Sequence, residues 1–281
     1  MAQLVHDAYR IAHDPDVFPW FGSVEGLARM RISRLDVGAI PPGSLLENLG
    51  QYAVPDEQRQ RLALLLLTLS FLFVIDHEYC HLANHHASLS LLKTASPGIV
   101  DSLTSQALEM DADTYAFNRW ADILFEKDSV LGRGEFSDLA STLREENRNA
   151  TYALFIYAMF CAFRSLGQQD WTATFPSTSP HPPAPFRFKT TLAALWERLE
   201  QSGSGSDLND YKGLLKVVWP LLEFLYTRES TRPPILLSLD DVSSPEATRH
   251  FHAVYGRWRD LVISRAISGW DGVEPPPIDE V

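Results

Sequence analysis

Two histidines four residues apart, His77 and His81, are the residues whose spacing most directly suggests chemistry. An α-helix turns about 100° per residue, so side chains four apart lie on one face and both imidazoles could reach a single metal ion. Glu78 completes the pattern His-Glu-x-x-His and would project beside that ion. A carboxylate in this position suits a general base that deprotonates a water activated by the metal. The sequence therefore predicts a metal clamp with Glu78 as its catalytic base.

The residues before this motif favour a metal over the alternative of an exposed helical turn with two solvated histidines. Residues 62–75 are apolar except for Thr68 and Ser70, and a helix that is apolar all round is expected to be buried. Polar groups at the end of a buried helix need partners, which a metal ion would supply. Residues 62–75 are also fewer than the roughly 20 that cross a bilayer, so no membrane insertion is expected.

A catalytic zinc site needs three protein ligands and an open position, so a third ligand must come from another element. The metzincin pattern would place a histidine at position 87, where this chain has Ala87. Glu109 is the predicted third ligand, and Asp113, one turn later on the same helix face, would accept the second ring proton of a metal-bound histidine. Asp111 is expected on the surface, and a solvated acidic face is the alternative for this helix. The expected cofactor is one Zn²⁺ per chain.

These motifs together resemble the gluzincins, and in detail the family of CAAX prenyl proteases and HtpX peptidases, which has membrane-embedded and soluble members. His86 extends the first motif to HExxHxxxxH, and residues 109–113 fit the family's ExxAD. Residues 179–183, with Arg187, are similar to its SxHPxxxxR segment. The resemblance extends over residues 63–199 and implies a zinc peptidase, but the transmembrane segments of the membrane-bound members are missing.

A second resemblance is to the soluble Lit-like phage-exclusion peptidases, which also carry HExxH and an ExxAD-like helix. They cleave an intracellular protein. The motifs do not separate the two families.

His181 is the candidate for a second catalytic role. Zinc peptidases need a hydrogen-bond donor that faces the metal across the substrate and stabilises the oxyanion. Prolines on both sides of His181 stiffen its loop, as a preorganised donor requires. Arg187 is the second candidate for this task or for anchoring the loop, and a surface histidine in a proline turn is the alternative.

Composition restricts the partners and the compartment. The chain has 281 residues, 45% of them hydrophobic, which is enough for a sizeable core. Its formal net charge of −12 leaves no excess of cations for phosphates, so nucleic acid is not expected as a partner. Two cysteines and an N-terminus without an apolar run indicate a cytoplasmic protein without a disulfide framework.

The predicted fold is mainly α, a helical zincin-like core. Residues 28–40 alternate enough for one or two strands, so a small N-terminal sheet and an α+β fold are the alternative. Helices are expected at about 2–13, 55–86, 102–127, 137–167, 186–201, 208–228 and 245–267. The Ser/Gly stretch 202–206 reads as a linker between a metallopeptidase domain, 1–201, and a C-terminal helical appendage, 207–281, that governs partner choice.

The expected function is that of a zinc-dependent endopeptidase acting on an intracellular protein or peptide. Two alternatives remain: a metal-containing protein that binds partners through its C-terminal helices without catalysis, and a metal-dependent amidohydrolase of a small substrate. Glu78 argues against the first, because a purely structural metal site does not need a base.

Overall fold

The computed structural model describes residues 2–14, 17, 56–84, 86, 101–125, 148–166, 181–182, 184–201, 218 and 244–264. All regular secondary structure in these ranges is helical, which confirms the mainly α prediction. The stretch 28–40, the linker 202–206 and nearly all of 208–228 lie outside the described residues, so the expectations for them stay predictions.

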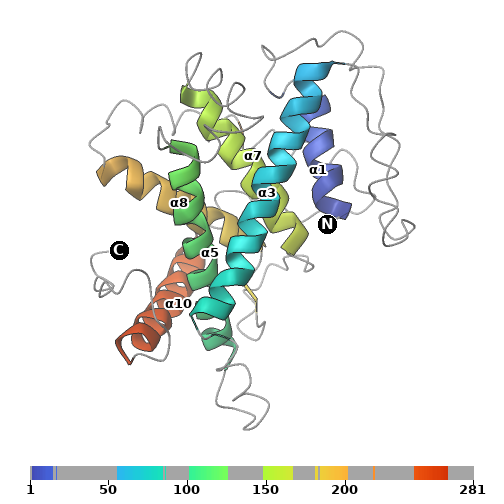
Figure 1. Cartoon of the computed structure of the whole chain (residues 1–281). Coiled ribbons are helices and arrows are strands. Elements are labelled where there is room, and N and C mark those ends of the chain that lie inside the picture. The colour runs from blue at the N-terminus through green and yellow to red at the C-terminus, as the bar shows by residue number, and fades with distance from the viewer. Residues whose placement is uncertain are drawn as a thin grey trace. The chain divides into compact units, whose positions relative to one another are not determined.

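Six long helices carry the described part of the chain (Figure 1). They are α1 (Ala2–His13), α3 (Glu57–Ala83), α5 (Ser102–Phe125), α7 (Arg148–Leu166), α8 (Ala184–Gln201) and α10 (Pro245–Ile263). The predicted bounds agree within about four residues, except that α7 is described from Arg148, whereas its start was expected near position 137.

Side-chain caps explain where three of these helices begin. The Asp56 carboxylate accepts the backbone N–H of Arg59 at 2.9 Å in α3, and Asp101 accepts that of Thr104 at 2.7 Å in α5. Ser244 does the same for α10, with Pro245 in the first turn. Such caps satisfy backbone donors that have no partner inside the helix.

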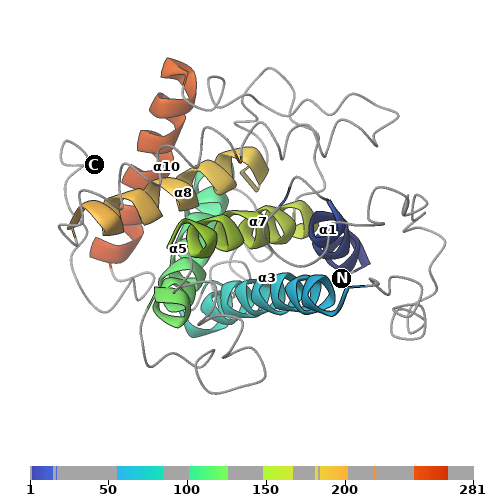
Figure 2. The ribbon, with the colours of Figure 1, turned by 90° about the horizontal axis from the view of Figure 1, so that it is seen from above.

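The chain forms two compact units that are interleaved in sequence. The first comprises Met1–Leu72, Asp122–Gln168 and Leu199–Arg232, and the second Phe73–Ala121, Gln169–Arg198 and Pro233–Val281. In the first unit α1 packs against α7, as the view from above in Figure 2 shows. The domain boundary expected between 201 and 207 stays a prediction, since residues 202–217 lie outside the described part.

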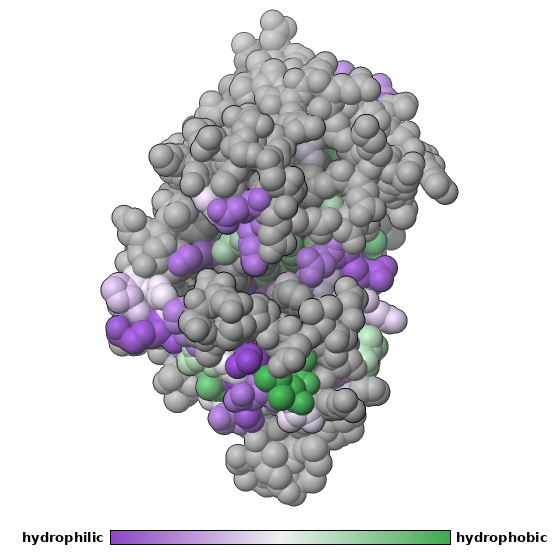
Figure 3. All heavy atoms as spheres, turned by 90° about the vertical axis from the view of Figure 1, so that its left-hand side faces the viewer, coloured by the Kyte–Doolittle hydropathy of each residue, from purple (hydrophilic) through white to green (hydrophobic). Residues whose placement is uncertain are grey.

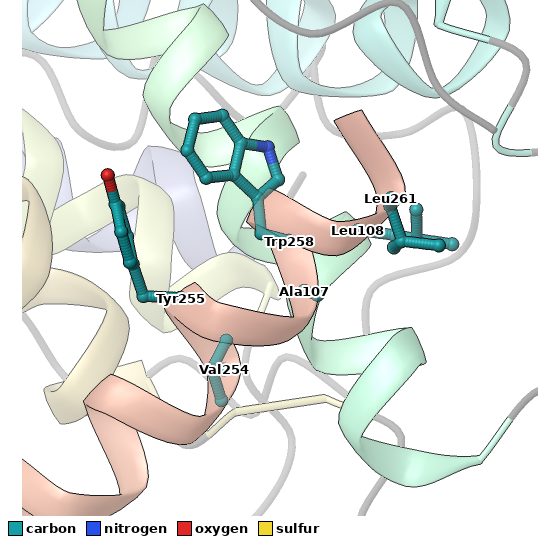
Figure 4. Packing of buried hydrophobic residues seen from close by; sticks show 6 residues of the cluster. All are labelled: Ala107, Leu108, Val254, Tyr255, Trp258 and Leu261. Atoms are coloured by element: carbon teal, nitrogen blue, oxygen red, sulfur yellow. The ribbon is translucent and has the colours of Figure 1, made fainter. Parts of the chain in front are cut away.

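The described core of the second unit includes an interface between α5 and α10 (Figure 4). Its buried members are Ala107, Leu108, Val254, Tyr255, Trp258 and Leu261. Two polar pairs flank them: His250 with Gln106 at 2.6 Å, and Arg257 with Thr104 at 2.7 Å. Apolar burial and these hydrogen bonds together fix α10 on α5.

Helix α3 is not buried on every side, contrary to the expectation from its apolar sequence. Phe71 and Ile75 are 39% and 44% exposed, and Tyr79 and Leu82 continue the exposed row toward the end of the helix. By length and composition alone α3 could cross a membrane, a property that core helices of soluble proteins share. On the face in Figure 3, hydrophilic residues predominate among those described, and hydrophobic ones show as a compact group low on the face with smaller spots elsewhere.

Candidate metal centre

The last two turns of α3 present His77 and His81 to a common point. Their Nε2 atoms lie 3.1 Å apart, and their rings meet edge to face with centroids 4.8 Å apart. His77 is buried and His81 half-buried. The helical spacing therefore places two imidazole nitrogens side by side, as the sequence predicted.

Glu109 of α5 supplies the third converging group. Its two carboxylate oxygens each lie 3.5 Å from a histidine Nε2: Oε2 from His77 and Oε1 from His81. Ligand atoms around a tetrahedral zinc ion with bonds near 2.1 Å are about 3.4 Å apart. The observed separations match this spacing, so His77, His81 and Glu109 form a group that could hold a metal ion.

Asp113 lies behind His77, one turn after Glu109. Its Oδ1 is 3.0 Å from His77 Nδ1, close enough for an ion pair but without the alignment of a hydrogen bond. Burial alone would lower the pKa of His77, but the carboxylates of Asp113 and Glu109 outweigh it and raise that pKa to about 9. The surrounding carboxylates thus favour a positive charge at this point, which a metal ion would also provide.

Arg187 of α8 contacts two carboxylates of α5, those of Asp113 and Glu109. Its guanidinium donates two hydrogen bonds to Asp113, at 2.8 and 2.7 Å, and Nη1 lies 3.3 Å from Glu109 Oε2. Burial would raise the pKa of Asp113, but the Arg187 charge holds it below its usual value. Arg187 is itself buried among these anions, so its donors are engaged within the site.

His181 lies at the exposed edge of the same group. Its Nδ1 is 3.2 Å from Glu109 Oε1, and 62% of its side chain is exposed. The contact with Glu109 raises the pKa of His181. The structure thus brings His181 next to the three converging groups, in a position where a substrate could reach it.

Glu78 lies at the surface, and its charge acts on the buried Arg187. Its side chain is exposed, and it makes no hydrogen bond or ion pair with the residues that the structure describes. Glu78 is thus open to solvent and stands one residue from His77 in the sequence.

Asp111 corrects a prediction: it is fully buried, not on the surface. Trp258 donates to its Oδ1 at 2.7 Å and Asn84 to its Oδ2 at 2.7 Å, while His86 Nε2 lies 3.1 Å from Oδ2. The reason is that α10 covers this side of α5. Glu109, Asp111 and Asp113 are all buried, which excludes the alternative of an acidic surface face at these positions.

A second group of potential ligands surrounds Asp111. Cys80 Sγ lies 3.5 Å from Asp111 Oδ2, and Cys80, His86 and Asp111 are all buried. Burial and the nearby Asp111 charge raise the pKa of the Cys80 thiol above its usual range. Cys80 and Cys161 are both free and buried.

The sequence predicted the residues that converge at the first group but missed the surroundings of Asp111. His86 carried a signal, since it stands five residues after His81, but neither Asn84 nor Trp258 belongs to a recognisable pattern. Comparison with protein-family models, with curated proteins and with solved structures finds no match.

Proposed function

We propose that this protein is a zinc-dependent endopeptidase that hydrolyses peptide bonds of an intracellular protein. One observation carries the proposal: the side chains of His77, His81 and Glu109 converge at the spacing of metal ligands. The exposed Glu78 lies on the same turn of α3 as the two histidines. His77, His81 and Glu109 would hold one Zn²⁺ and leave a fourth position open. The resemblance in motifs to soluble gluzincin peptidases supports the same class.

Bound zinc would supply Lewis acidity, polarising the scissile carbonyl and making an attacking water acidic near neutral pH. Glu78 is the general base that takes the proton of the water and passes it to the leaving amine. Its exposure supports this role, because a carboxylate locked in an ion pair would be a weaker base. Asp113 orients the ring of His77, and Arg187 fixes Asp113.

His181 is the proposed donor to the oxyanion that develops on the carbonyl. Its exposed side chain and its place at the edge of the group support this assignment, and the raised pKa favours its protonated, donating form. Arg187 is less suited to the task, because Asp113 and Glu109 occupy its donors.

The test compares cells that express the wild type with cells that express Glu78→Gln, by proteome-wide identification of new peptide termini. The amide is isosteric with the carboxylate but cannot take the proton, so hydrolysis should fall by about 10² to 10⁴ while zinc content and fold persist. New termini are expected with the wild type alone. Identical termini in both cultures, at equal expression, would rule out the proposed peptidase.

A further inference from the structure

A continuous series of polar contacts, partly buried at His81 and buried from His86 onward, begins at His81 Nδ1, the ring nitrogen that does not contact Glu109. His81 Nδ1 lies 2.8 Å from His86 Nδ1, and His86 Nε2 lies 3.1 Å from Asp111 Oδ2. The other oxygen of Asp111 accepts the indole N–H of Trp258 at 2.7 Å. The series thus runs from a candidate metal ligand to helix α10.

The chemistry of imidazole gives this series one direction. A histidine nitrogen that binds a metal carries no proton, so His81 with Nε2 as its ligand atom must carry its proton on Nδ1. That N–H points at His86 Nδ1, which must then accept it. His86 carries its own proton on Nε2, where Asp111 accepts it. Every donor in the series faces an acceptor.

The same atoms cannot serve as a second metal site at the same time. A metal on Cys80, His86 and Asp111 would need His86 Nε2 without a proton, which moves the proton of His86 to Nδ1. His81 Nδ1 would then have to accept the hydrogen bond from His86 Nδ1–H. The proton of neutral His81 would in turn sit on Nε2, which could no longer bind the first metal ion. The Asn84 amide N–H, 2.7 Å from Asp111 Oδ2 and 3.4 Å from Cys80 Sγ, also presents a positive dipole to these atoms.

We propose that His86 and Asp111 are positioning residues for His81, and that Trp258 and Asn84 hold Asp111 for this purpose. The proposal rests on the metal centre proposed above. Each histidine ligand then has its own buried carboxylate: Asp113 lies directly behind His77, and Asp111 acts on His81 through His86. Such contacts fix the ring orientation and tautomer of a ligand, and their loss typically weakens metal binding by about 10- to 100-fold.

The test measures the zinc affinity of the full-length protein by competition with a chromophoric chelator, in three variants of similar side-chain volume. His86→Leu removes both contacts, while His86→Gln offers an amide oxygen to His81 and an amide N–H to Asp111. His250→Leu is the matched control. His250 of α10 also forms a hydrogen bond with α5, to Gln106, but it is not part of the series that begins at His81. Thermal unfolding of each variant separates zinc affinity from stability.

We expect His86→Leu to weaken zinc binding by about 10- to 100-fold, His86→Gln to recover most of this loss, and His250→Leu to bind zinc like the wild type. Unchanged affinity in His86→Leu, or equal affinities in the Leu and Gln variants, would refute the positioning role. If His86→Leu does not fold, Asp111→Asn replaces it. The same loss of zinc affinity, about 10- to 100-fold, is expected, and unchanged affinity would refute the positioning role.

Stoichiometry distinguishes this proposal from its competitors. A wild type that binds two zinc ions, one of which is lost in Cys80→Ala, would assign the second group as a metal site and overturn the positioning role. A wild type that binds no zinc would overturn the metal centre itself. One zinc in the wild type with unchanged affinity in His86→Leu would overturn the positioning role and leave the metal centre intact.

Discussion

Arg59 in the first unit and Arg187 in the second are both buried, but the groups at their hydrogen-bonding atoms differ. Arg59 Nη1 donates to three backbone carbonyl oxygens, those of Ala12, Asp14 and Val17. Arg187 lies between two carboxylates. Burial lowers the pKa of Arg59, whereas the carboxylates outweigh burial and raise the pKa of Arg187.

The difference separates a structural polar centre from one that can take up a further cation. Backbone carbonyls accept the hydrogen bonds of Arg59, and the charges of Asp56 and Asp14 partly offset the effect of its burial. Asp113 and Glu109 carry two charges against the single charge of Arg187, and a buried surplus of this kind is costly unless another cation balances it. The arginine partners therefore indicate which centre could bind a metal.

The largest expected effect is on metal content. The wild type should carry about one zinc per chain, and His81→Ala should carry none, because two remaining ligands cannot hold the ion. Arg59→Met should keep its zinc. Elemental analysis of the purified proteins checks this prediction. Equal zinc content in the wild type and in His81→Ala would show that His81 is not a zinc ligand.

The stabilities of two matched arginine variants come next. Arg187→Met leaves Asp113 buried without its partner and should cost about 3 to 5 kcal/mol of unfolding free energy. Arg59→Met leaves carbonyl groups without donors and should cost about 1 to 3 kcal/mol. Zinc should restore part of the loss only in Arg187→Met, where the ion replaces a missing positive charge.

Denaturant titrations with and without zinc measure these losses. An equal response of both variants to zinc would contradict the distinction between the two arginine centres.

A smaller effect is expected on the exposed side of the metal centre. His181→Ala should lower kcat by about 10² on a confirmed substrate while zinc occupancy and stability stay near wild type, because the variant loses only an oxyanion donor. Steady-state kinetics and elemental analysis check both halves of the prediction. A kcat within a few-fold of wild type would mean that His181 is a surface histidine without a catalytic role, and the oxyanion donor would be unassigned.

The smallest effect concerns the start of the helix that carries the carboxylates. Asp101→Ala removes the cap of α5 and should cost about 1 kcal/mol without changing zinc affinity. The hydrogen bonds from Thr104 lower the pKa of Asp101, so its contribution is present above the ordinary carboxyl pKa and is lost as the pH falls through the lowered value. Unfolding measured from neutral to acid pH should show a difference between the two proteins that narrows in acid.

Local signals predicted most of the described helices, whereas contacts between distant segments did not follow from the sequence. Asp56 and the apolar run after it mark α3, and the four-residue spacing of the histidines places both on one face. Asp111 was expected on the surface because helical periodicity places it away from Glu109 but does not reveal that α10 packs there. Its partner Trp258 is 147 residues further along the chain.

The wide separation of these contacts along the chain has a consequence in time. Synthesis adds about 5 to 20 residues per second, so roughly 10 s pass between the emergence of Asp111 and that of Trp258. Arg187, 74 residues after Asp113, also follows its partner by several seconds. A nascent chain therefore exposes its histidines and carboxylates for several seconds before the residues that hold them in place are synthesised.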